Sequence, residues 1–395
     1  MFRDVRALLV WVVMLLGWVP VALGQDVEAP EQESRPEVQP AATAAEVYTA
    51  AGFVFHGEME GFVPRGRPGV REGGLVVPGD YFGLKAGLEE LDAAIWWLGE
   101  ERLDILESPE AGAGAGQPWS GVGDMTTSGW AIARTFENGR GSNHLGAAYL
   151  LGPEGEVIPV DAPFYNQIAP CDVNEAGVVV GWYSPNRQWR GFMWSRETGL
   201  IDLGEDGTDT VQAIAINNHG MMAGYCNRDE GDFRRVWFAP DDVIDLWFPE
   251  GFDGGSAFDI NDDSVVLVNL FRCVRHARGT LHVYSPFLWN VEEGYSALPR
   301  PDGGSVFAYQ MSASGDVLMT QRTRPAPGDR LDQVTTLYVC TSDGDLIAIP
   351  DYPGATETEC RYISESGHIV GHAVFVDGEE QRYVGFVISF DGDAE

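Results

Sequence analysis

A strand–turn–strand unit recurs along this chain and limits the folds that are open to it. Its clearest copy runs from Cys171 to Tyr183, and further copies begin near positions 215, 259, 311 and 363. With the turn residue as the marker, the copies fall at positions 74, 129, 177, 220, 264, 315 and 367, at intervals of 43 to 55 residues. That interval is typical of a four-stranded propeller blade.

The turn in this unit has a clear physical basis. In the copy at 174–177, the Asn174 side chain can bond its own turn backbone, and Gly177 tolerates a positive φ. Ser264 stands where the other strong copies have glycine. The Val-rich segment that follows favours a pleated strand, so each unit predicts a tight hairpin.

Two further strands complete each unit. An aromatic segment such as 191–194 is followed by an Ile-Asp-Leu-like segment such as 201–203. We therefore predict an all-β fold, a β-propeller of about seven four-stranded blades, with six blades or another antiparallel β-repeat as the alternative. The last unit lacks a fourth strand, and residues 51–56 would supply it and close the ring, because an open ring exposes two sheet edges.

The N-terminal region divides into two segments before this domain. Residues 1–24 combine Arg3 and Arg6 with a long apolar run and small residues at the cleavage positions, which is typical of a secretory signal peptide. Residues 25–44 are rich in acidic residues, Pro and Ala, and we predict a disordered linker. The repeat domain then spans 45–395. The protein is expected to be secreted, extracellular or periplasmic, and free of the membrane after cleavage.

Charge and cysteine content narrow the function further. The chain has 25 basic and 60 acidic residues, a net charge of −35, which disfavours nucleic acid as a partner. Its five cysteines are an odd number without metal-type spacing, so we expect at most one disulfide. No cofactor and no metal site is predicted. Asp259-x-Asn261-x-Asp263 begins like a calcium loop, but Ser264 and Leu270 replace its required Gly and Glu.

The repeat resembles the HAF-type probable extracellular repeat of secreted bacterial proteins. That pattern is approximately Ile-Asn-x-x-Gly-x-Val-Val-Gly-Tyr, then His-Ala-Phe-Leu-Trp, then Asp-Leu-Gly. The first and third parts match at 173–183 and 201–204, whereas Arg190 stands where the family has His. The match is strong only from Cys171 to Leu298. The resemblance implies the fold and secretion, and it implies no reaction.

The candidate binding residues lie in the loops between the second and third strands. These loops carry 14 of the 24 arginines and share one face of the predicted disc with the connections between blades. Guanidinium groups suit carboxylate, sulfate or phosphate, and tryptophans beside them suit sugar stacking. The candidates are Trp182, Arg187, Trp189, Arg190, Arg235, Arg272 and Arg275.

These features predict a monomeric extracellular binding or scaffolding module, whose partner is a polysaccharide or an extracellular protein. The sharper hypothesis is recognition of an anionic glycan or protein by the arginine-rich loops. Two alternatives stay open. The arginines could instead pair with acidic connections between blades, and the chain could be a propeller glycosidase or lyase that uses channel carboxylates. No catalytic residue is assigned.

Overall fold

The computed structural model describes residues 42–390, apart from 72–73, 82–91, 99–101, 108, 110–118, 137–144, 162–167, 185–188, 205–209, 229–230, 277–278, 302–303, 324–333 and 379. The predicted signal peptide and residues 25–41 of the predicted linker lie outside the described residues. Residues 42 onward belong to one compact unit.

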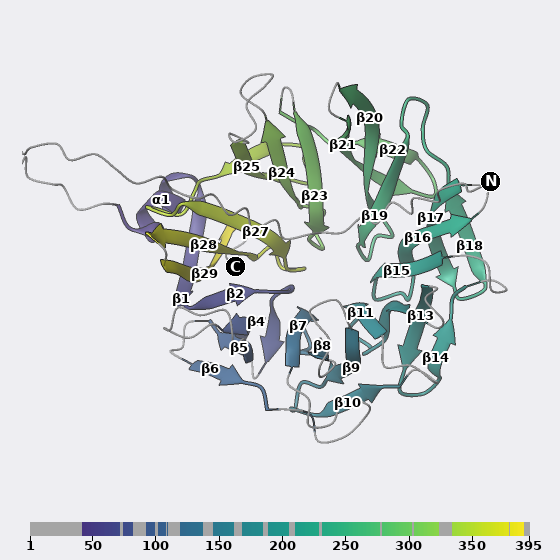
Figure 1. The fold of residues 1–395 in the computed structure, drawn as a ribbon, viewed down its shortest axis with the longest axis horizontal. Coiled ribbons are helices and arrows are strands. Elements are labelled where there is room, and N and C mark those ends of the chain that lie inside the picture. Colours follow the sequence, from purple (N-terminus) through teal and green to yellow (C-terminus); the bar gives the residue numbers. More distant parts are fainter. Residues whose placement is uncertain are drawn as a thin grey trace, which may run out of the picture. The chain divides into compact units, whose positions relative to one another are not determined.

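Seven antiparallel sheets follow one another along this unit, as predicted (Figure 1). The first blade holds β2 (Phe62–Pro64), β3 (Gly69–Arg71), β4 (Gly74–Tyr81), β5 (Asp92–Trp97) and β6 (Arg102–Ile105). The second holds β7 (Trp119–Met125), β8 (Ala131–Phe136), β9 (Leu145–Leu151) and β10 (Val157–Val160). The third holds β11 (Ile168–Val173), β12 (Val179–Tyr183), β13 (Arg190–Ser195) and β14 (Gly199–Asp202).

The remaining blades repeat this order. The fourth holds β15 (Thr210–Ile216), β16 (Met222–Arg228), β17 (Gly231–Ala239) and β18 (Asp242–Leu246). The fifth holds β19 (Gly254–Ile260), β20 (Val266–His276), β21 (Gly279–Asn290) and β22 (Gly294–Ala297). The sixth holds β23 (Ser305–Met311), β24 (Val317–Thr323), β25 (Val334–Cys340) and β26 (Leu346–Ile349). The seventh holds β27 (Glu357–Ile363), β28 (Ile369–Asp377), β29 (Glu380–Phe390) and β1 (Phe53–Glu60).

Strand β1 closes the ring, as we predicted from the strand at residues 51–56, which belongs to no repeat unit of its own. It pairs antiparallel with β29, from Phe53 opposite Phe390 to Glu60 opposite Val384. The N-terminal strand is therefore the outermost strand of the last blade. This pairing covers the edge that β29 would otherwise expose to another chain.

A short helix precedes β1 and was not expected from the sequence. Helix α1 (Ala44–Ala50) has a capping box, in which the Thr43 side chain accepts from the Glu46 backbone and the Glu46 carboxylate accepts from the Thr43 backbone. Tyr48 is fully buried and stacks on Phe386 of β29 at 5.4 Å between ring centroids. The helix thus anchors the closing strand. In the described part of the chain, no helix has both the length and the apolar character that a membrane span needs.

The hydrophobic core lies between neighbouring blades. One cluster joins Val180 of the third blade to Val211 and Met222 of the fourth, and similar clusters recur around the unit. The glycine of the Val-Val-Gly-Tyr motif has a packing reason. A Cβ at Gly181 would lie 2.1 Å from the Ala169 carbonyl oxygen of the inner strand, and the same holds for Gly224 against Gln212 at 2.0 Å. Only glycine fits there without moving the inner strand.

The hairpin between first and second strands forms as predicted. Asn174 Oδ1 accepts from the Ala176 and Val178 backbones, and Gly177 has φ +71°. Ser264 adopts φ +62° at the same place in the fifth blade, which strains a residue that has a side chain. The conformation is therefore set by the turn and not by glycine alone.

These turns also bond from blade to blade on one face of the disc, which we call the turn face. Asn174 Nδ2 donates to the Asn217 carbonyl at 3.1 Å, and Asn217 Nδ2 donates to the Asn261 carbonyl at 3.0 Å. The Glu175 carboxylate accepts from the Thr127 and Ser128 backbones of the second blade. The ends of the second strands and the beginnings of the third strands lie on the opposite face, the loop face, because strand direction alternates within each blade.

Candidate functional site: an axial cluster and the loop face

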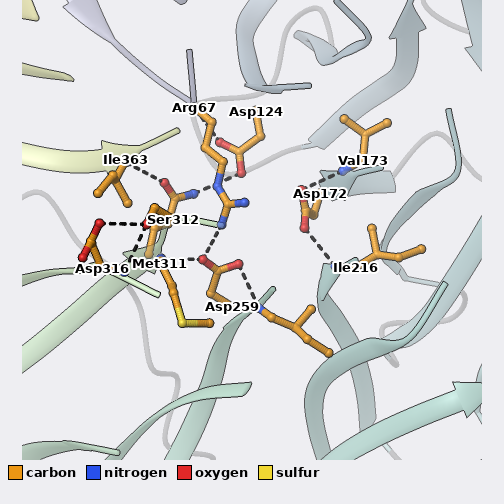
Figure 2. Close-up of polar contacts among 12 residues, drawn as sticks. Arg67, Asp124, Asp172, Val173, Ile216, Asp259, Met311, Ser312, Asp316 and Ile363 are labelled. Atoms are coloured by element: carbon orange, nitrogen blue, oxygen red, sulfur yellow. Dashed lines mark hydrogen bonds and ion pairs between the residues drawn. The ribbon is translucent and has the colours of Figure 1, made fainter. Parts of the chain in front are cut away.

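Three of the inner strands hold a polar residue at the same position, just after a bulge. Register shifts interrupt the pairing of β11, β19 and β23 just before Asp172, Asp259 and Gln310. Each of these side chains accepts a hydrogen bond from a backbone N–H of the next blade (Figure 2). The donors are Ile216, Met311 and Ile363, at 2.9, 2.7 and 3.2 Å respectively. The bulge therefore aims this residue at its neighbouring blade.

Arg67 enters the same region from the segment between β2 and β3. Its backbone N–H donates to Asp124 Oδ1 at 2.7 Å, and its guanidinium forms an ion pair with Asp259 (Figure 2). The side chain is only 12% exposed. Gly66 allows this approach, since a Cβ there would lie 2.2 Å from the Gly123 carbonyl carbon. The first blade thereby reaches across to the second and the fifth.

The charges in this axial cluster of Arg67, Asp124, Asp172 and Asp259 do not balance. Burial opposes the charge of Arg67, but the nearby Asp259, Asp172 and Asp124 raise its pKa, so the guanidinium stays charged. Burial raises the pKa of Asp124, against the effect of Arg67. Burial, with Asp124 and Asp259 nearby, also raises the pKa of Asp172, to about 8. One cation faces three buried carboxyl groups, which favours the protonated form of at least one of them.

Convergent carboxyl groups with shifted pKa values are what the enzyme alternative predicted, but this cluster has the features of a structural joint. Asp172 accepts from the Val173 and Ile216 backbones, and Asp124 accepts from Arg67 and Gln310. The adjoining cavity has a volume of about 30 Å³. That space admits about two water molecules, and it is too small for a sugar ring. The cluster holds blades together and offers no carboxylate to a saccharide.

Two of the predicted binding arginines serve the scaffold. The prediction that Arg235 binds a ligand is wrong. Its side chain is 1% exposed and pairs with Asp245 at 2.7 Å, so it is out of reach of a ligand. Arg190 bonds Asp202 at 2.5 Å and the Gly204 carbonyl at 3.2 Å. Asp202 also accepts from the Tyr183 hydroxyl, so the pair belongs to a network. Both arginines therefore pair with an acidic residue of the fourth strand of their blade.

Four of the other predicted residues, Trp182, Trp189, Arg272 and Arg275, lie at the loop face. Trp182 and Trp189 are half-buried, with ring centroids 5.2 Å apart and planes 35° apart. Arg187, between them in sequence, lies outside the described residues. Arg272 and Arg275 are exposed on β20, and the Arg272 guanidinium lies 4.6 Å from the centre of the Phe252 ring. The structure thus places the two tryptophans together in the third blade and the two exposed arginines on one strand of the fifth, where their three-residue spacing turns them to opposite sides.

We did not predict the axial cluster from the sequence. Asp172 and Asp259 each precede the turn Asn by two residues, and this shared place was a usable signal. Arg67 gave none, because it lies between Gly66 and Pro68 in a degenerate part of the first unit. Its role depends on a contact with Asp259, 192 residues away.

Comparison with known proteins agrees with this fold. No protein-family model matches the chain, and no curated protein matches it in sequence. The β-propeller domain of the Trilobed protease from Pyrococcus furiosus is similar in structure, with a TM-score of 0.51 and 10% identity over 83% of this chain and 94% of that chain. A chain of the COPII outer coat vertex has a TM-score of 0.50 and 9% identity, over 82% and 84%. Virginiamycin B lyase from Staphylococcus aureus has a TM-score of 0.45 and 12% identity, over 85% and 99%.

The class of protein follows from the topology. The chain is an all-β, seven-bladed propeller, with four-stranded antiparallel blades and a closing strand from the N-terminus.

Proposed function

We propose that this protein is a secreted, monomeric binding module that recognises an anionic polysaccharide or protein through its loop face. The observation that carries the proposal is the hairpin of β20 and β21. These strands have 11 and 12 residues, whereas β12 and β13 have 5 and 6. The longer hairpin carries Arg272 and Arg275, both exposed. Exposed guanidinium groups suit carboxylate or sulfate groups.

The surrounding charge gives this patch its selectivity. The chain as a whole carries a net charge of −35, so a polyanion is repelled from most of the surface. The two exposed arginines of this hairpin are therefore a local positive charge on an acidic chain. We therefore expect binding that weakens with salt and that depends on these two side chains.

The test is a binding measurement with alginate and heparin as probes. The double variant Arg272→Ala/Arg275→Ala should lose at least tenfold in affinity. Arg196→Ala is the matched control, because Arg196 is 51% exposed and lies on the turn face. Unchanged binding by the double variant, or no binding by the unmodified chain to either probe, would overturn the proposal.

A second candidate function is carbohydrate cleavage, and one observation favours it. Glu357 and Glu359 lie two residues apart on β27, on the same side of the strand. Burial raises the pKa of Glu357, and the charge of Glu359 raises it further. Glu359 is paired with Arg361 at 2.8 Å. Glycoside hydrolysis uses one protonated acid and one carboxylate, and this pair of glutamates offers both. Release of reducing ends from alginate that is lost in Glu357→Gln would support it, and no release by the unmodified chain would exclude it for that substrate.

A further inference from the structure

A row of aromatic rings crosses from the fifth blade to the sixth. The stack begins at His282 and Phe271, whose rings are parallel within 6° and 4.4 Å apart. Tyr284 packs edge-on against Phe271 at 5.6 Å and against Phe307 at 5.3 Å. Phe307 also contacts Phe258 at 4.8 Å and Tyr309 at 5.3 Å. The aromatic row therefore consists of His282, Phe271, Tyr284, Phe307, Phe258 and Tyr309.

The aromatic row is not part of the core. All six side chains keep partial exposure. Several residues that alternate with them in the same strands are fully buried, among them Leu270, Val306 and Ala308. On β20 the row continues the side that carries Leu267 and Asn269, both fully buried, and its rings become partly exposed toward the loop face.

The blade repeat does not require these rings either. Phe258 and Tyr309 occupy the bulged position of the inner strand, where the third and fourth blades have Cys171 and Ile214. Phe307 lies two residues earlier, where those blades have Ala169 and Gln212. The same fold is built there with residues that have no aromatic ring. Aromatic residues at these places in the fifth and sixth blades are therefore a local feature.

We infer that the aromatic row is a stacking platform for the pyranose rings of a linear, acidic saccharide; this inference rests on the proposed function of the loop face. The row begins on the hairpin that carries both arginines, and Arg275 lies on the same side of β20 as Phe271, because the two are four residues apart. Arg272, the direct neighbour of Phe271, lies on the opposite side, over Phe252. Rings offer apolar faces to the C–H faces of sugars, and Arg275 meets the acidic groups along the chain. The row continues through Phe307 to Tyr309 on the inner strand of the sixth blade. An extended ligand suits this arrangement better than a single anion.

The test compares two probes, a mannuronate hexasaccharide from alginate and the neutral cellohexaose, by titration calorimetry. Phe307→Leu and Tyr284→Leu keep an apolar side chain and remove the flat face. Each should weaken binding of both probes by about 3- to 10-fold. Arg272→Ala/Arg275→Ala should weaken binding of the mannuronate probe only. Trp247→Leu is the control, because Trp247 is a 71% exposed aromatic outside the row and its replacement should change neither affinity.

The outcomes separate this inference from the proposed function. If the leucine variants bind both probes as the unmodified chain does, while the arginine variant loses the acidic probe, the aromatic row is a packing feature and only this inference fails. If the leucine variants lose binding and the arginine variant does not, the proposed role of the arginines fails. Binding of neither probe overturns both. Should a leucine variant unfold, His282→Ala at the hairpin end of the row makes the same test.

Discussion

The side-chain amide of Asn174 donates to the main-chain carbonyl of Asn217, the residue that holds the same place in the next blade. Asn217 repeats the contact with Asn261. One residue type therefore closes its own turn through Oδ1 and fastens the neighbouring blade through Nδ2. The repeat motif is a joint as well as a turn.

Replacing Asn217 should test the two roles together. In Asn217→Ala, the His219 and Met221 backbone N–H groups lose their acceptor and the Asn261 carbonyl loses its donor. We expect the free energy of unfolding to fall by roughly 2–4 kcal/mol. Asn290→Ala is the matched control, because Asn290 accepts from Glu292 and Glu293 within its own turn. It should cost about 1 kcal/mol. Urea unfolding measures both, and equal losses would contradict the inter-blade role.

Two substitutions at the turn glycine position should change the free energy of unfolding in opposite directions. Ser264→Gly relieves a side chain held at φ +62°, so a gain of about 0.5–1 kcal/mol is expected. Gly220→Ala places a Cβ at φ +80° with no atom within 4 Å, so its cost of about 1–2 kcal/mol is conformational and not steric. Thermal unfolding compares the pair. A loss of stability in Ser264→Gly would mean that the serine makes a contact that outweighs its strain.

Arg67 should be worth more to stability than an exposed arginine. Arg67→Gln leaves Asp259 buried beside Asp172 and Asp124 without a counter-charge, and we expect a loss of about 3–5 kcal/mol. Adding Asp259→Asn to this variant should restore part of the loss, because it removes the stranded charge. Denaturant titration of the single and double variants is the measurement. Additive losses would show that the two groups do not interact.

The axial cluster should also make stability depend on pH. The pKa of Asp172 is raised from 3.8 to about 8 in the folded chain, so the folded state binds the proton more tightly than the unfolded state. This contribution is complete at acid pH and is lost as the pH rises from about 4 through about 8. Asp172→Asn should therefore lose stability less steeply than the unmodified chain between pH 5 and pH 8. The measurement is the urea midpoint of both chains across that pH range. If the two curves of midpoint against pH run parallel, the pH dependence comes from a group other than Asp172.

The closing strand β1 should be needed for the stability of the whole propeller. A chain that begins at Gly61 lacks β1 and exposes the edge of β29, so it should unfold at a lower temperature and self-associate. A chain that begins at Ala42 keeps α1 and β1 and is the control. Scanning calorimetry and light scattering give the two readouts. Equal melting of both chains would mean that closure by β1 contributes nothing.

The fold was predictable because its signals are local. Asn174 and Gly177 define a turn from four residues, and the same turn at a regular interval gave the blades. Closure by β1 followed from the missing fourth strand of the last unit and the unassigned strand at residues 51–56. The axial cluster was not predictable, since Arg67 meets Asp259 only after five blades are in place. The aromatic row likewise joins strands from two blades, and no spacing in the sequence marks it.

The loop-face arginines show the same limit. Arg235 and Arg272 look alike in sequence, each within an aromatic-flanked strand. One is buried against Asp245 and the other is exposed over Phe252. Sequence placed both near the loop face, but side-chain direction on a strand depends on register, and a shift of one residue reverses it.

Hydrogen–deuterium exchange with and without alginate tests the central claim most directly. Binding at the loop face should slow exchange in 266–290, the hairpin that carries Arg272 and Arg275, and leave the turns at 174–177 and 217–220 unchanged. Protection of those turns, with the hairpin unaffected, would place the ligand on the turn face and contradict the account.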